Sequence, residues 1–390
     1  MSFPTSPTNG QIATLSNGIT YSYTSATNYW ARVPGAVSAL PSFKNRLING
    51  AMTFAQRGSS PVSNTVASAT LKYNTLDRWG YWAGANGYFY LEQSTASVPP
   101  GYNYSALITS GSATTVSSGV YATFSQRIEG YNILDLLWGT STAQSVAVSF
   151  WINCSLTGTF SGYVFNSNYS YCYPFTFTIP TANTWVQITK LIPGPTSGTW
   201  NTTNSIGLEF GITLAAGSNY QDTANAWTTK SYAIGSAGST NLLATNGATM
   251  YVTGVQLEAG ASATTFDYRD YTRELQMCQR YYYRIQAFSG TSGVNILTAN
   301  LYTYQSGYSP IILPVAMRTN PTGSYSALSD FYLGSAGNYV VLTSITANNG
   351  YASPNLVEFY WFTGANLTNG NSGFIRINNS SGWLDYSAEL

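Results

Sequence analysis

The side chains of this 390-residue sequence that could do acid–base chemistry are carboxylates, because the chain contains no histidine. Without imidazole, Ser-His-Asp and Cys-His catalysis and histidine-based metal sites are excluded. A carboxylate pair acting on a glycosidic bond is the catalytic alternative that remains. The candidates for such a pair are Asp77, Glu92, Glu129, Asp135, Glu209, Asp222 and Glu258.

None of these carboxylates stands in a recognisable catalytic motif. Glu209 lies opposite the apolar residues of an alternating stretch, so we expect it to face solvent. Asp77 stands beside Arg78 and Trp79, which indicates a structural ion pair next to a buried indole. Walker loops, EF-hand spacings and Gly-x-Ser-x-Gly elbows are also missing from the sequence. We therefore expect a protein that is not an enzyme and that needs no cofactor and no metal.

The composition is unusually poor in charge and rich in aromatic residues. Charged residues make up 7% of the chain, against about 25% in an ordinary soluble domain. A net charge of +1 gives no field for holding a polyphosphate backbone, so nucleic acid is not an expected partner. Aromatic residues at 15% and hydrophobic residues at 44% are enough to build a core, which excludes disorder.

The location follows from what the sequence lacks. Residues 1–10 carry no basic side chain and no apolar run, so we expect no secretory signal peptide. No apolar stretch approaches the ~20 residues of a spanning helix, so we expect no membrane insertion. Cys154, Cys172 and Cys278 fit no metal spacing and are expected to be buried free thiols. A protein made in a cytoplasm and carried outside within a virus particle fits this combination.

Period-two alternation dominates the chain and predicts an all-β protein. Residues 1–34 form a small β-hairpin module, with Ser16-Asn17-Gly18 as the expected turn. Residues 35–44 follow as a linker. Residues 45–267 hold many short alternating strands between turn residues, which predicts a β-sandwich. The pattern returns over 285–390, where we expect a second, sandwich-like β-domain.

The exception is a short helix or joint at 268–284, where charge is concentrated. Tyr271, Leu275, Cys278 and Tyr282 follow one another at spacings of 4, 3 and 4, and Asp270 is a candidate N-cap. A helix this short is marginal alone, so it must bury that stripe. Two alternatives stay open: packing against its own chain, or a seam between three parallel chains.

Aromatic residues near turns carry the strongest binding signal, because Tyr and Trp combine a large contact area with a polar tip. Core packing or subunit contact is the competing interpretation for each of them. The candidate receptor-binding residues are Trp82, Tyr88, Tyr102, Tyr104, Tyr325, Tyr351 and Trp361.

Three groups of motifs resemble modular phage tail fibres. The first is similar to the short module that joins such proteins to a virion: Phe3-Pro4-Thr5-Ser6-Pro7, Asn17-Gly18-Ile19-Thr20-Tyr21 and Tyr29-Trp30. The second is similar to a jelly-roll domain of the carbohydrate-binding-module type: Arg46-Leu47-Ile48-Asn49-Gly50, Gln56-Arg57-Gly58, Asp77-Arg78-Trp79 and Gln256-Leu257-Glu258. The third looks like the region that follows: Cys278-Gln279-Arg280-Tyr281-Tyr282-Tyr283, Leu313-Pro314-Val315-Ala316-Met317-Arg318 and Ala388-Glu389-Leu390.

The resemblance implies a homotrimeric fibre that adheres to a host-surface glycan or protein without catalysis. It implies that the sandwich is a jelly-roll and that residues 285–390 are distal. Tail or adaptor proteins would then bind the first module, through residues such as Phe3, Pro4, Tyr21 and Trp30. A capsid-attached fibre or decoration protein is one alternative. A tailspike-type enzyme that degrades polysaccharide is the other.

Overall fold

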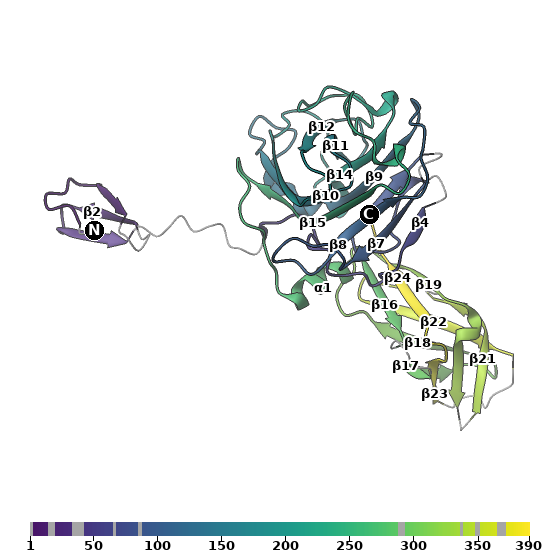
Figure 1. Ribbon diagram of the computed structural model, residues 1–390. Coiled ribbons are helices and arrows are strands. Elements are labelled where there is room, and N and C mark those ends of the chain that lie inside the picture. The colour runs from purple at the N-terminus through teal and green to yellow at the C-terminus, as the bar shows by residue number, and fades with distance from the viewer. Residues whose placement is uncertain are drawn as a thin grey trace. The chain divides into compact units, whose positions relative to one another are not determined.

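The computed structural model describes residues 3–14, 20–32, 43–64, 68–84, 88–287, 293–335, 338–347, 352–364 and 372–390 (Figure 1). The chain divides into two compact units, Met1–Lys44 and Asn45–Leu390. Strands make up most of the regular structure, as the alternation predicts. No helix within the described ranges is long and apolar enough to cross a membrane.

The first unit is a three-stranded antiparallel sheet. Strand β1 (Ile12–Thr14) pairs with β2 (Thr20–Thr24), and β2 pairs with β3 (Tyr29–Arg32). The turn expected at Ser16-Asn17-Gly18 lies outside the described residues. Phe3 packs on this sheet, with its ring stacked on Trp30 at 4.8 Å between centroids. Aromatic contacts therefore hold together a unit that is too small for a core of its own.

The second unit begins with two six-stranded antiparallel sheets that face each other as a jelly-roll. One sheet has the order β13-β10-β15-β8-β7-β4, and the other has the order β12-β11-β14-β9-β6-β5. Their strands are β4 (Val62–Asn64), β5 (Ser68–Lys72), β6 (Gly80–Ala83), β7 (Phe89–Ser94), β8 (Ser105–Ser110), β9 (Tyr121–Glu129), β10 (Val146–Cys154), β11 (Gly158–Asn166), β12 (Cys172–Ile179), β13 (Val186–Ile192), β14 (Ile206–Ala216) and β15 (Thr249–Ala259). Short 3-10 helices lie at Gly130–Asn132, Leu134–Leu136, Ser218–Tyr220, Leu242–Ala244 and, later in the chain, Leu328–Asp330.

The core lies between the two sheets. Phe150 and Phe177 come from facing sheets and meet edge to face at 5.3 Å. Trp79 stacks on Phe124 at 4.9 Å and is fully buried, as its motif predicts. A second buried cluster, which includes Tyr163 and Phe165, covers the outer face of the second sheet. Because of this cover, β14 is buried along almost its whole length rather than on one face.

The C-terminal region is a closed six-stranded barrel with a small three-stranded sheet beside it (Figure 1). The barrel order is β17-β18-β22-β21-β20-β23, and the small sheet is β16-β24-β19. These strands are β16 (Tyr282–Gln286), β17 (Val294–Leu301), β18 (Ser306–Ile312), β19 (Thr322–Tyr325), β20 (Phe331–Ser335), β21 (Asn338–Thr346), β22 (Leu356–Thr363), β23 (Ser372–Ile377) and β24 (Trp383–Ser387). Where the sequence predicts a sandwich-like domain, the strands close on themselves. Alternation gives each strand an inner and an outer face in both architectures, so it does not distinguish them.

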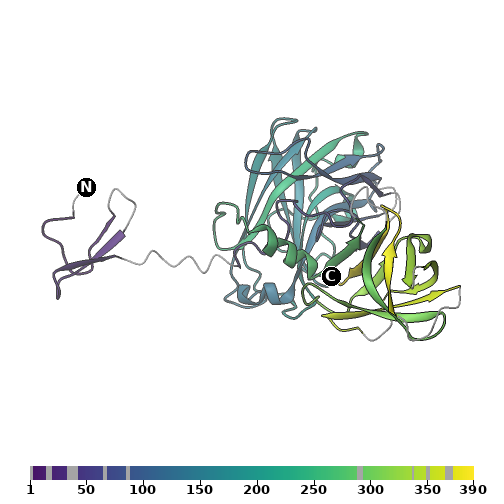
Figure 2. The same ribbon diagram turned by 90° about the horizontal axis from the view of Figure 1, so that it is seen from below.

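Helix α1 (Tyr271–Gln279) joins the jelly-roll to the barrel and is shorter than predicted. The carboxylate of Asp270 accepts the amide of Arg273 at 2.9 Å, which confirms the predicted N-cap. The helix ends before Tyr282, which belongs to strand β16. Cys278 is buried against Ile48 and Phe54 of its own chain, so the apolar face of α1 packs on the jelly-roll (Figure 2).

A buried network of charges links the jelly-roll to the small sheet, and we call it the junction: Arg57, Asp77, Arg78, Tyr281, Tyr282, Arg284, Asp385 and Glu389. The carboxylate of Glu389 accepts Arg57 Nη2 at 3.1 Å and also Arg78 Nη1. The two guanidinium groups lie over the rings of Tyr282 and Tyr281, at 3.5 and 3.6 Å from the centroids. Each cation is therefore held between a carboxylate and an aromatic face.

Asp77 is expected to pair with its neighbour Arg78, and here the structure differs. Asp77 accepts the backbone and side-chain amides of Gln56 at 3.0 and 2.6 Å. Its nearest cation is Arg57, at 4.0 Å. Arg78, whose backbone is left-handed (φ 67°), instead pairs with Glu389 near the end of the chain. Burial raises the pKa of the Asp77 carboxyl to about 6, since a charge there loses its hydration.

We predict that Glu389→Gln destabilises the second unit by about 3 to 5 kcal/mol, because it leaves two buried guanidinium groups without their carboxylate. Urea denaturation followed by tryptophan fluorescence measures this loss. Glu358→Gln is the matched control, since Glu358 lies half-buried on β22 and forms no ion pair with the described residues. Equal stability of the two variants would contradict the role assigned to the junction.

Candidate functional site

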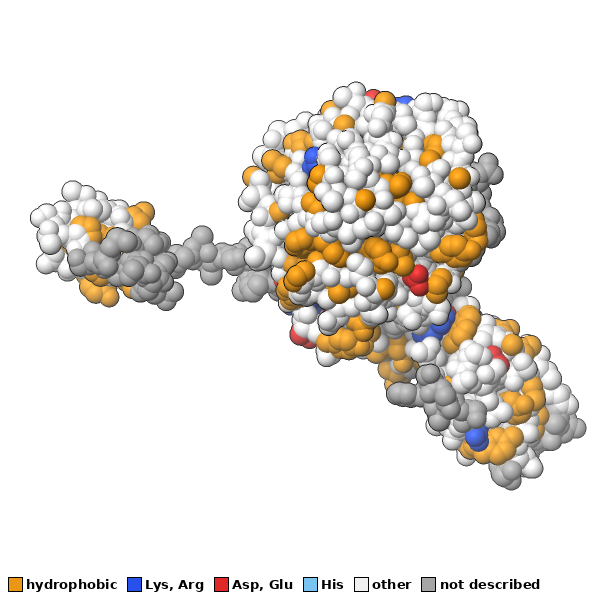
Figure 3. Space-filling view, in the orientation of Figure 1, with side chains coloured by type: hydrophobic (Ala, Val, Ile, Leu, Met, Phe, Trp, Pro, Cys, Tyr) orange, Lys and Arg blue, Asp and Glu red, His pale blue; other side chains and the backbone are white. Residues whose placement is uncertain are grey.

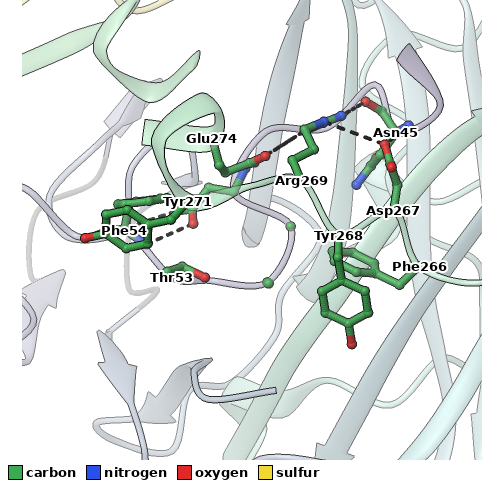
Figure 4. Close-up of a pocket in the computed structure, with 12 residues that line it drawn as sticks. Asn45, Thr53, Phe54, Phe266, Asp267, Tyr268, Arg269, Tyr271 and Glu274 are labelled. Atoms are coloured by element: carbon green, nitrogen blue, oxygen red, sulfur yellow. Dashed lines mark hydrogen bonds and ion pairs between the residues drawn. The ribbon is translucent and has the colours of Figure 1, made fainter. Parts of the chain in front are cut away.

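A cavity of about 160 Å³ opens beside the start of α1 (Figure 4). Its lining comes from the segment that enters the jelly-roll and from the segment that leaves it. The residues are Asn45, Asn49, Gly50, Ala51, Thr53, Phe54, Phe266, Asp267, Tyr268, Arg269, Tyr271 and Glu274. We call this cavity the α1 pocket.

The floor of the α1 pocket is polar and fixed. Arg269 is only 4% exposed and donates from Nη1 to Glu274 Oε2 at 3.0 Å. It also bonds the backbone oxygen of Asn45, and its Nε lies 3.7 Å from Asp267 Oδ2 without a hydrogen-bond partner. The backbone amide of Asn45 donates to the same Asp267 oxygen at 3.3 Å. Arg269 faces two carboxylates, Asp267 and Glu274, so the floor offers fixed hydrogen-bonding groups and one excess negative charge.

Exposed tyrosines form the walls of the α1 pocket. Tyr271 is 67% exposed, and its ring contacts Phe54 at 4.8 Å on one side (Figure 4). Tyr268 is 61% exposed, and its ring contacts Phe266 at 4.9 Å on the other. Tyr102 packs behind Tyr268 at 5.7 Å, and burial raises the pKa of its phenol well above the usual value. The walls are therefore aromatic rings, and the hydroxyl of Tyr268 donates to the backbone oxygen of Gly101 at 3.1 Å.

This arrangement suits a small polar ring better than an anionic or purely apolar ligand, because the two carboxylates of the floor outnumber its one arginine. Aromatic faces contact the C–H groups of a ring, while fixed polar groups below them exchange hydrogen bonds with hydroxyls. The volume is less than the roughly 300 Å³ at which drug-sized pockets begin. One sugar residue, held between Tyr268 and Tyr271, is the kind of ligand that fits.

The candidate receptor-binding residues of the jelly-roll are divided between surface and core. Tyr102 does not line the α1 pocket but packs against two of its lining rings, Phe266 at 5.4 Å and Tyr268 at 5.7 Å. Tyr88 is half-buried and contacts Tyr90 at 5.2 Å, and Tyr104 packs partly on the core. Trp82 is buried, with its indole N–H donating to Glu209 at 2.9 Å. A buried indole presents no surface to a receptor, so we assign Trp82 to packing.

The candidate receptor-binding residues of the barrel are also divided between core and surface. Trp361 is fully buried, with its indole N–H 3.3 Å from Ser309 Oγ, and it too belongs to the core. Tyr325 is half-buried against the core, and Tyr351 lies outside the described residues. The residues on either side of Trp361 point outward instead, because side chains alternate along a strand.

Those outward residues form an aromatic row across the barrel surface. Tyr360 contacts Tyr308 of the paired strand at 4.7 Å and Phe362 at 4.9 Å. Tyr302 extends the row, 5.7 Å from Tyr308. Farther along the same two strands, Ile312 is 82% exposed opposite Leu356. The barrel thus presents an apolar face that a single chain leaves in water.

The carboxylates considered for catalysis are mostly engaged in structural bonds. Glu209, expected to face solvent, is fully buried under the second cluster and accepts Arg127 Nε at 3.0 Å. Glu129 accepts Arg280 at 2.6 Å, and Asp135 accepts Arg46 at 2.6 Å. Glu258 accepts the amide and hydroxyl of Thr264, and Asp222 accepts the hydroxyl of Thr228. Glu92 lies on β7, and partial burial raises its pKa.

Two of the four residues predicted for a seam between chains are buried within one chain, namely Cys278 and Tyr282. Of the other two, Tyr271 is exposed and Leu275 is partly exposed, so these two remain available for contact between copies. The residues predicted for virion attachment lie together: Phe3, Tyr21 and Trp30 form one aromatic cluster, and Pro4 is exposed beside it.

All three cysteines are buried free thiols, as predicted. Within the described ranges, no cluster of His, Cys, Asp or Glu could hold a metal ion.

Comparison with known proteins shows structural likeness only. No family model and no curated protein matches the chain. Among solved structures, the chain is similar to the enzymatically active domain of tailspike protein 4 from bacteriophage CBA120, with 11% identity and a TM-score of 0.30. That match covers 56% of this chain and 22% of the tailspike domain.

Carbohydrate-active proteins appear among the similar structures too. A family 11 carbohydrate-binding module from Clostridium thermocellum, in complex with a mixed-linked tetrasaccharide, has 12% identity and a TM-score of 0.25 over 53% of this chain and 99% of the module. The arabinose-bound α-L-arabinofuranosidase MgGH51 has 16% identity and a TM-score of 0.33 over 56% of this chain and 26% of the enzyme. Scores of this size leave the function to the geometry of the chain's own residues.

Sequence reasoning missed Tyr268, Arg269 and Phe54 as site residues. A usable signal was present, because Phe266, Tyr268 and Tyr271 alternate with the charges of the predicted joint. Aromatic rings among scarce charges differ from the outward face of an ordinary helix. Phe54 could not be found in this way, since it lies more than 200 residues away along the chain.

We predict losses of stability of very different size at two adjacent positions of β22. Trp361→Ala should cost about 3 to 5 kcal/mol by emptying the barrel core. Tyr360→Ser should cost about 1 kcal/mol, because it removes only surface ring contacts. Thermal unfolding of both variants against the parent measures the difference. The assignment of inner and outer faces fails if Tyr360→Ser is the more destabilising change.

Proposed function

We propose that this chain is a subunit of a trimeric phage tail fibre that recognises a host-surface glycan without catalysis. The observation that carries the proposal is the α1 pocket, where exposed Tyr268 and Tyr271 stand over a floor of fixed polar groups. Protein-bound sugars need ring faces for stacking and fixed polar groups for hydroxyls, and the pocket supplies both. A protein receptor would need a larger contact area than this cavity provides.

The low charge of the chain supports recognition by rings and hydroxyls. Charged side chains are few on the face seen in Figure 3. Salt at the concentrations met outside a cell shortens the range of charge interactions to about 3 to 8 Å. A surface that binds through stacking and neutral hydrogen bonds keeps its affinity there.

The first unit is the proposed attachment module, and the virion is the proposed location. Its cluster of Phe3, Tyr21 and Trp30 offers half-buried rings beside the exposed Pro4. A tail or adaptor protein would complete the burial of these rings. A capsid-attached fibre could use the same module, so antibody labelling of particles in the electron microscope distinguishes the two sites.

We predict that Tyr268→Ser and Tyr271→Ser each reduce binding of the full chain to host cells at least tenfold. Each change removes one ring wall while leaving the floor in place. Binding of fluorescently labelled protein to host cells measures the effect. Tyr131→Ser is the matched control, because Tyr131 is 58% exposed on the jelly-roll away from the lining of the pocket.

The outcome also decides between a glycan and a protein receptor. Cells whose surface glycans have had their vicinal diols oxidised by periodate should lose the interaction, whereas protease-treated cells should keep it. Unchanged binding by both tyrosine variants would place recognition elsewhere, with the aromatic row of the barrel as the next surface to alter.

We predict that the full chain sediments and scatters light as a trimer at micromolar concentration. The exposed pair of Ile312 and Leu356 would then be covered, since an apolar face of this kind is costly in water. Ile312→Asp together with Leu356→Asp should lower the measured mass if copies meet there. A monomeric parent protein would contradict the trimer.

One observation favours the tailspike-type enzyme as a second candidate. Asp267 and Glu274 both line the α1 pocket, with Arg269 between them. Against catalysis, both carboxylates already accept bonds from Arg269 or from backbone amides. Incubation with host envelope should release no reducing ends. Release that Asp267→Asn or Glu274→Gln abolishes would assign hydrolysis to this pocket instead.

A further inference from the structure

A second cavity, larger and differently charged, lies beside the junction. It has a volume of about 460 Å³ and is open to solvent. Its lining combines the jelly-roll with the small sheet: Arg57, Val62, Leu71, Lys72, Tyr73, Asn74, Tyr282, Arg284, Ser324, Asp385 and Ser387. We call it the junction cleft, and it shares no residue with the α1 pocket.

Two cations of the junction cleft lack a full set of partners. Lys72 ends strand β5 and is exposed, and its side chain forms no ion pair or hydrogen bond with the described residues. Arg57 is 9% exposed, and its Nη1 has no hydrogen-bond acceptor. The nearest carboxylate oxygen, on Asp77, is 4.0 Å from that nitrogen. By contrast, Arg284 is satisfied, because Asp385 accepts two of its N–H groups at 2.7 Å.

The charges around the junction cleft do not balance. Four cations, Arg57, Lys72, Arg78 and Arg284, face three carboxylates, Asp77, Asp385 and Glu389. The carboxylate of Glu389 is shared between two of the arginines. The excess positive charge therefore falls at Lys72, at the open side of the cleft. Such a site lacks one anion.

The rest of the lining suits the body of a sugar. Ser324, Ser387 and Asn74 bring hydroxyl and amide groups to the cleft, and Tyr73 brings a ring, whereas the ring of Tyr282 is buried under Arg57. The volume falls within the roughly 300 to 1,000 Å³ of small-molecule sites, which is more than a bare ion requires. We propose that the junction cleft binds an acidic saccharide, with Lys72 contacting its carboxylate or phosphate group.

The test is isothermal titration calorimetry of the full chain at low salt with glucuronate, glucose 6-phosphate and glucose. At least one of the two charged probes should bind, glucose should not, and salt at 0.5 M should weaken the binding. The preferred charged probe distinguishes a carboxylated from a phosphorylated ligand. Failure of both charged probes, or equal binding of glucose, would overturn the proposal.

Variants locate the contact. Lys72→Gln should weaken binding about tenfold, because one charge-assisted hydrogen bond is lost, and Lys72→Arg should restore most of it. Lys190→Gln is the matched control, since Lys190 lies on β13 in the other sheet and also has no ion pair among the described residues. Unchanged affinity of Lys72→Gln would place the anion elsewhere. Tyr271→Ser should leave this binding intact, so the two pockets succeed or fail separately.

Discussion

The carboxylate of Glu389, held by two buried arginines, is the interaction on which the second unit depends. Glu389 lies near the end of the sequence. It bonds Arg57, which is 332 positions before it, and Arg78, which is 311 positions before it. Burying three charges together is favourable only when each finds a partner, because an unpaired ion loses its hydration without compensation. Tyr281 and Tyr282 complete the arrangement by placing ring faces on the two guanidinium groups. The jelly-roll and the barrel are therefore fastened by charge and not only by apolar contact.

This requirement for paired buried charges explains where the few charged residues of the chain lie. Seven arginines and eight carboxylates form ion pairs among the described residues, out of 29 charged residues in all. Most of these pairs are at least partly buried, so they fix the positions of segments rather than the solubility of the surface. The surface is left to tyrosine, serine, threonine and asparagine. A protein of this kind meets its ligands through rings and neutral donors, and a free cation such as Lys72 becomes conspicuous.

The sequence alone predicts the strands, the helix cap and the buried Trp79, because each depends on residues a few positions apart. The sequence does not predict the burial of a side chain that is covered by residues far away along the chain. Glu209 alternates correctly but is buried, since a second cluster lies over its face of the sheet. Trp361 and Tyr360 are both plausible surface aromatics, and only the barrel register decides which points inward. The partner of Arg78 could not be found either, because the adjacent Asp77 is the nearer carboxylate in sequence but bonds Gln56.

The shape of the α1 pocket also depends on the buried ion pairs that link the jelly-roll to the barrel. Helix α1 begins at Tyr271 in the pocket wall, and it carries Glu274 to the pocket floor and Cys278 to the cluster with Ile48 and Phe54. The chain then enters the junction directly at Tyr281. A helix of nine residues is marginal alone, so its position is set by what holds its two ends. Arg269 and Asp270 hold the first end, and the guanidinium of Arg78 over Tyr281 holds the second. The geometry of the pocket walls therefore rests on the buried charges as much as on the jelly-roll that surrounds them.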